Sequence, residues 1–107
     1  MLIANIYVSQ RKLRCVGQLP AMQEALKAGS CLPRITLGRG PDGHVQVEDG
    51  HHRLVAIWMT GRRELRKDEY LLVEKEIVRP RLGTVQDLLA RCRIASPDGE
   101  ADVMPRF

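Results

Sequence analysis

The chain has 107 residues, of which 44% are hydrophobic and 28% charged, and its 17 basic and 13 acidic side chains give a net charge of +4. This length suits one domain, and this composition excludes a wholly disordered protein. Every stretch without a charged residue is much shorter than the roughly 18 residues of a membrane-spanning helix, which excludes such a helix.

The first half of the chain predicts a strand and then a helix. Apolar residues over 2–8 alternate well enough for a strand. Apolar residues then fall at helical spacing between Pro20, which suits a first helical turn, and Gly29, which suits a helix end. We therefore expect a short helix at about 20–28.

A hairpin and a buried helix follow. Strands at 34–37 and 44–48 flank Gly40-Pro41-Asp42-Gly43, a strong turn sequence. The next helix, expected at 52–60, is closed by Gly61. Its residues from Leu54 onward are apolar on every side, which is typical of a helix buried in the core.

The last third predicts one more strand, one more helix and a tail. The strand begins at Tyr70 and reaches about Val78, before Pro80. A capping box from Thr84 to Asp87 starts an amphipathic helix. The chain is therefore expected to be a small α+β domain over 1–95, with a mixed or antiparallel sheet of about four strands and three helices. Residues 96–107 are expected to be a mobile tail.

The three cysteines indicate a reducing compartment. Cys15, Cys31 and Cys92 are odd in number and widely spaced, which fits neither a disulfide framework nor a zinc module. We expect reduced thiols in a cytoplasmic protein.

The segment Asp49-Gly50-His51-His52-Arg53 carries the clearest chemistry. It joins a strand directly to a helix, whose first N–H groups lack internal partners and lie at the positive end of the helix dipole. Gly50 lets an anion approach the backbone, Arg53 adds a two-pronged donor, and the histidines add donors or a proton carrier. The pattern predicts a phosphate site.

A simpler interpretation of the same residues stays open. Asp-Gly at a strand end is also an ordinary turn with a helix cap, and adjacent histidines can simply be solvated. Asp49 itself suits three roles, because it can cap the helix, hold a metal or bind a substrate hydroxyl.

The run from Pro41 to Ala56, with Gly61 closing the helix, resembles the ParB/sulfiredoxin superfamily. That family has a strand, then Gly-x-His/Arg-Arg, then a buried helix ending at Gly. The order of elements upstream also matches, so the resemblance covers about residues 2–78. It implies the ParB/sulfiredoxin fold and an ATP or CTP site whose phosphates rest on this turn.

The resemblance assigns roles to single residues. Gly50, His51, His52 and Arg53 would contact the nucleotide phosphates, and Asp49, His51 and His52 would be catalytic. The nucleotide would carry Mg²⁺, held mainly by its own phosphates. The sulfiredoxin motif has its catalytic Cys where this chain has His51, so sulfinic-acid reduction is not expected.

Two functions follow from these patterns. The first is an NTP hydrolase or phosphotransferase, in which Arg53 and the helix N-terminus stabilise the transferred phosphoryl group. The alternative is a ParB-like DNA-associated binding or regulatory module without catalysis, and a ParB-like nuclease is a third option. DNA would be bound through a basic cluster, which alternates with acids as a solvated face also does: Arg62, Arg63, Arg66 and Lys67.

Overall fold

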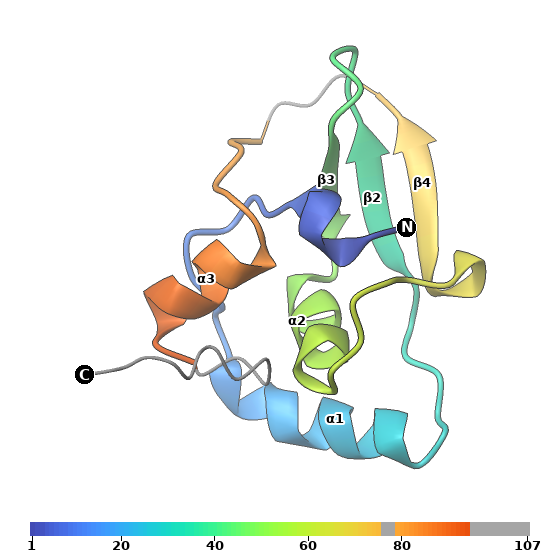
Figure 1. Cartoon of the computed structure of the whole chain (residues 1–107), viewed down its shortest axis with the longest axis vertical. Coiled ribbons are helices and arrows are strands. Elements are labelled where there is room, and N and C mark those ends of the chain that lie inside the picture. The colour runs from blue at the N-terminus through green and yellow to red at the C-terminus, as the bar shows by residue number, and fades with distance from the viewer. Residues whose placement is uncertain (76–78, 95–107) are drawn as a thin grey trace.

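A mixed four-stranded sheet forms one layer of the protein in a computed structural model that describes residues 1–75 and 79–94 (Figure 1). The strands lie in the order β1-β3-β2-β4. The central pair, β2 and β3, is antiparallel, and each outer strand is parallel to its neighbour. The strands are β1 (Ile6–Tyr7), β2 (Ile35–Arg39), β3 (Val45–Asp49) and β4 (Tyr70–Glu74).

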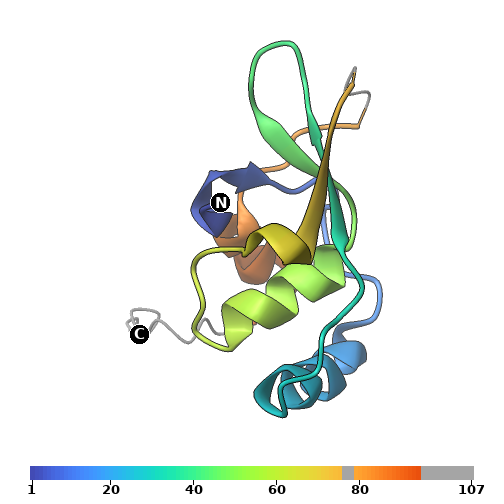
Figure 2. The ribbon, with the colours of Figure 1, turned by 90° about the vertical axis from the view of Figure 1, so that its right-hand side faces the viewer.

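Three α-helices within the described residues pack with this sheet, which confirms the expected α+β class. They are α1 (Leu19–Lys27), α2 (His51–Met59) and α3 (Val85–Cys92). Short 3-10 helices precede β1, α1 and β4, and they are η1 (Ile3–Asn5), η2 (Val16–Gln18) and η3 (Lys67–Glu69). Figure 2 shows α2 between the sheet and α1. This position explains why α2 is apolar on every side, since it contacts β2, α1 and α3.

The core lies on the helix side of the sheet. Alternate residues of the central strands, including Ile35, Leu37 and Val47, are at most 1% exposed there. The other face carries Gly38 and Glu48. A Cβ on Gly38 would lie 3.2 Å from the Cγ of Glu48, so the Glu48 side chain packs closely over this glycine. From the helices come Leu54, Val55, Ala56, Ile57 and Trp58 of α2 and Val85, Leu88 and Leu89 of α3.

The predicted strand at 2–8 is wrong in most of its length. Residues 3–5 form η1, and β1 contains only Ile6 and Tyr7. Ile3 and Ile6 are both fully buried while Leu2 is half exposed, so burial here recurs every third residue, as in a 3-10 turn, and not every second. The extension of the last strand towards Val78 and the tail at 96–107 lie outside the described residues.

Candidate functional site

The turn between β3 and α2 depends on glycine. Gly50 has φ +111°, in the left-handed region that side chains disfavour. A Cβ on Gly50 would also lie 3.2 Å from two side-chain carbons of Ile35. Because residue 50 is a glycine, this turn packs directly against Ile35 of the sheet. Only backbone atoms are present at this point of the turn.

The first turn of α2 has no side-chain cap among the described residues. The Gly50 carbonyl accepts the first helical hydrogen bond from the Leu54 N–H at 2.9 Å, which leaves the first N–H groups of the helix without internal partners. The option that Asp49 caps this helix is wrong. Its carboxylate instead lies 3.1 Å from the Arg53 guanidinium and is 77% exposed. The positive end of the helix is thus available to an anion.

The Arg53 side chain folds back across Gly50. One terminal nitrogen donates to the Arg34 carbonyl at 2.7 Å, and the other pairs with Asp49. That second nitrogen would be 3.3 Å from a Cβ on Gly50. The guanidinium is therefore held in one place beside the glycine turn.

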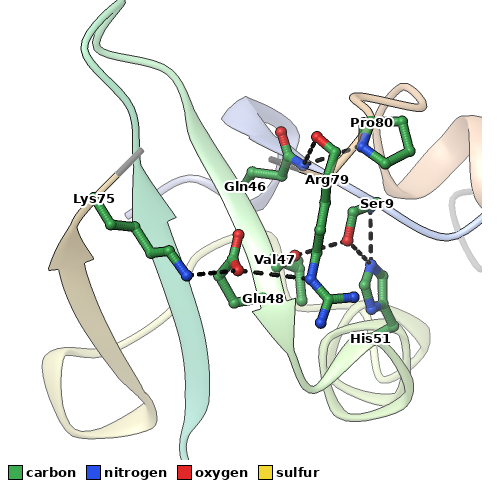
Figure 3. Close-up of polar contacts among 8 residues, drawn as sticks. All are labelled: Ser9, Gln46, Val47, Glu48, His51, Lys75, Arg79 and Pro80. Atoms are coloured by element: carbon green, nitrogen blue, oxygen red, sulfur yellow. Dashed lines mark hydrogen bonds and ion pairs between the residues drawn. The ribbon is translucent and has the colours of Figure 1, made fainter. Parts of the chain in front are cut away.

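His51 is buried and joins the helix to the chain after β1. Its Nε2 accepts the Ser9 N–H at 2.9 Å, while the Ser9 hydroxyl donates to the Val47 carbonyl at 2.8 Å (Figure 3). Burial, and then the nearby charge of Arg79, lower the pKa of His51 to about 4. The ring is therefore neutral at pH 7, and because Nε2 is an acceptor the proton lies on Nδ1.

His52 makes a matching contact one residue later. Its Nε2 accepts the Cys15 N–H at 3.1 Å. Partial burial, followed by the charge of Arg14, lowers the pKa of His52. Both histidines thus use Nε2 to hold residues 9–15 against the start of α2. This fixes the segment that carries Arg14.

A cavity of about 390 Å³ opens at this junction. All five predicted residues line it. The structure adds walls from the segment after β1, from η2 and α1, and from the connection that follows β4. The lining residues are Gln10, Arg14, Gln18, Met22, Glu48, Asp49, Gly50, His51, His52, Arg53 and Arg79.

Arg14, Glu48 and Arg79 are site residues that sequence reasoning missed. The Glu48 side chain is only 11% exposed, and it pairs with Lys75 at 3.3 Å and with Arg79 at 3.6 Å (Figure 3). The backbone around Arg79 is held by Gln46, whose amide nitrogen donates to the carbonyl of Arg79 at 3.0 Å. Only the alternation of apolar and polar residues along β3 points to Arg79, and it does so indirectly. It places Gln46 and Glu48, the two residues that hold Arg79, on one face of the strand.

The predicted DNA-binding cluster lies beyond the opposite end of α2, where two of its members, Arg62 and Arg66, line a second cavity of about 250 Å³ together with the end of α1. Arg62 makes two 2.7 Å hydrogen bonds to Glu69, which raise the pKa of Arg62 and lower that of Glu69. Arg63 lies 3.7 Å above the Trp58 ring. Arg66 and Lys67 are the exposed members of this cluster.

No family model, curated protein or solved structure matches this chain. Within residues 1–75 and 79–94, no helix has the length and apolar character needed to cross a membrane.

Proposed function

We propose that the cavity at the start of α2 binds the phosphates of ATP or CTP, and that the chain is a ParB/sulfiredoxin-like nucleotide-binding domain. The observation that carries the proposal is the meeting of three guanidinium groups with an uncapped helix N-terminus at a glycine turn. Arg14, Arg53 and Arg79 come from three separate parts of the chain, yet all line one cavity. Its volume of about 390 Å³ is within the common range of ligand pockets.

The charges of the cavity favour an anion. The three arginines face two carboxylates, Asp49 and Glu48, and His51 is neutral at pH 7. Arg53 and Arg79 already pair with those carboxylates, whereas Arg14 has no acidic partner among the described residues. A phosphate would therefore engage Arg14 first and then draw the other two guanidinium groups towards it.

Turnover by this site would be hydrolysis of the nucleotide or transfer of its terminal phosphoryl group. Such reactions depend mainly on positioning and on stabilising negative charge, which the arginines and the helix N–H groups supply. Asp49 is the residue to orient or activate the attacking hydroxyl, since it is 77% exposed beside the glycine turn. The Nδ1–H groups of His51 and His52 would be donors to the phosphates, and Mg²⁺ would be held mainly by the nucleotide phosphates. We also propose that the protein acts in the cytoplasm.

The test is thermal unfolding with ATP, CTP, GTP or ADP, each with and without Mg²⁺. A ligand at 100 times its Kd should add about 2.7 kcal/mol to the free energy of unfolding. Arg14→Ala, His52→Ala and Arg53→Ala should abolish the shift. Arg66→Ala, an exposed arginine at the far end of α2, is the matched control and should keep it.

A second measurement separates binding from catalysis. Steady-state release of phosphate or of the nucleoside diphosphate that Arg53→Ala and Asp49→Asn abolish would establish turnover. Binding without release would exclude hydrolysis, and would leave a nucleotide-regulated module or a phosphotransferase whose acceptor is missing from the assay.

The DNA-associated alternative rests on the net charge of +4 and on the exposed Arg66 and Lys67. A gel-shift series at two salt concentrations tests it, because phosphate contacts weaken steeply with salt. No thermal shift with any nucleotide would overturn the main proposal. Salt-sensitive DNA binding that Arg66→Ala and Lys67→Ala reduce would then support the alternative.

A further inference from the structure

The two edges of the sheet are finished differently. At the β1 edge, the Val8 N–H donates to the Gly83 carbonyl at 2.8 Å and the Leu82 N–H donates to the Val8 carbonyl at 2.9 Å. The connection before α3 therefore covers that edge. The opposite edge is β4, which Figure 1 shows at the margin of the molecule and Figure 2 shows nearest the viewer.

The outer backbone groups of β4 have no partner among the described residues. The Lys75 N–H donates inward to the Arg39 carbonyl of β2, and strand backbone groups alternate in direction. The N–H and C=O groups of Tyr70, Leu72 and Glu74 therefore point away from the sheet. An open row of such groups is a template for another strand.

β4 has few of the features that usually protect an edge strand. Residues 70–73 are Tyr-Leu-Leu-Val, without proline or charge, and the one charged residue of the strand is Glu74 at its end. The irregularity of this sheet lies between β2 and β3. Leu71 is 49% exposed on the sheet face that the helices leave open. Such edges normally carry lysine, proline or a bulge that prevents pairing. We propose that β4 pairs with β4 of a second copy of this chain, joining two sheets into one.

The charges at the two ends of β4 select an antiparallel pair. Asp68 and Glu69 come just before the strand, and Lys75, 44% exposed, follows it. An antiparallel second copy brings each Lys75 beside the acids of the other chain. A parallel copy would instead place like charges together.

The register follows from the outward groups. With Leu72 opposite Leu72 of the second copy, Tyr70 faces Glu74 and every outward N–H and C=O of the strand finds a partner. On the open face, Leu71 then lies opposite Val73. Shifting the register by two residues towards the N-terminus would set Asp68 against Glu74, which like charge disfavours.

Sedimentation velocity of the full chain over a wide concentration range tests the pairing, with a reversible dimer as the expected result. Glu74→Pro removes an outward N–H and blocks the edge, yet leaves the bonds to β2 intact, so it should raise the dimer dissociation constant at least about tenfold. Glu74→Ala, which also loses the ion pair with Arg39 but keeps its N–H, is the matched control and should still dimerise. Leu71→Lys changes an exposed side chain of the same strand, and it should also weaken the dimer.

Amide hydrogen exchange supplies an independent test. Protection of the outward amides of Leu72 and Glu74 should rise with protein concentration, whereas the inward amides of Leu71 and Val73 stay protected throughout. A chain that remains monomeric at every concentration would overturn the proposal. A dimer that survives both Glu74→Pro and Leu71→Lys would overturn it as well.

Discussion

The Nε2 atom of His51 accepts the Ser9 N–H inside the protein, where His51 is 4% exposed and Ser9 8% exposed. His51→Phe should therefore lower the free energy of unfolding by about 2–3 kcal/mol, because it leaves a buried donor unpaired. His51→Gln keeps an acceptor and should cost less. His52→Phe is the neighbouring control, and should cost under about 1 kcal/mol since its partner lies near solvent. Chemical denaturation of the three variants measures this order.

The pKa of about 4 at His51 also sets a pH dependence. Between about pH 6.5 and 4 the unfolded chain binds a proton at this residue and the folded chain does not. Stability should thus fall as the pH drops through this window, by about 1–3 kcal/mol, and this contribution should change no further below it. Unfolding at several pH values, with His51→Gln alongside, isolates the effect. An equal slope in the variant would contradict this assignment.

The β3–α2 junction depends on Gly50 for both conformation and space. Gly50→Ala should cost about 2–3 kcal/mol, because it combines a left-handed backbone with contacts at 3.2 Å to Ile35. Gly43→Ala is the matched control, since Gly43 has φ +83° but nothing within 4 Å of a Cβ. Its cost should be about 1 kcal/mol. If both variants lost the same unfolding free energy, the close contacts with Ile35 would contribute nothing to the cost of Gly50→Ala.

α3 begins with a capping box that the structure confirms. The Asp87 carboxylate accepts the Thr84 N–H at 2.9 Å and the Thr84 hydroxyl at 3.3 Å. Asp87→Ala should lower the unfolding free energy by about 1 kcal/mol. Gln86→Ala, an exposed change in the same turn, is the control and should be close to neutral in the same thermal melt.

Elements with local chemical signals could be predicted from the sequence. The hairpin was fixed by its Gly-Pro-Asp-Gly turn, α2 by its apolar surface and Gly61, and α3 by Thr84 and Asp87. Each signal acts within a few residues, so neighbours in the sequence carry it. The predicted strand at 2–8 was wrong because apolar residues at 3 and 6 satisfy a 3-10 turn as well as a strand.

The candidate site shows the same division. The residues from Asp49 to Arg53 could be found because they adjoin one another at a turn. Arg14 and Arg79 could not, because they reach the cavity only through tertiary contacts: the histidine bonds to residues 9–15, and the Gln46 and Glu48 contacts with Arg79. The alternation along β3 shows only that Gln46 and Glu48 share a polar face, and it does not identify the distant residues that these side chains contact.

The whole molecule needs α3 for its core. Val85, Leu88 and Leu89 are at most 2% exposed, and burying each side chain stabilises the fold by roughly 1.5–3 kcal/mol. Removing residues 84–107 should therefore abolish cooperative thermal unfolding, given a total stability of about 5–15 kcal/mol. Removing only residues 96–107, the predicted tail, should leave Tm nearly unchanged. A large loss from the shorter truncation would contradict the domain boundary at 95.

The sheet order also has a kinetic consequence. The central hairpin joins strands that are neighbours in sequence, whereas β1 and β4 pair with strands far along the chain. Local contacts close first because their loop entropy is small, so the hairpin and the Gly50 turn should form before the edges. The segments that carry Arg14 and Arg79 should therefore be the last to reach the cavity during folding. A ligand that bridges early and late parts of the site should mainly slow unfolding, and leave the folding rate almost unchanged.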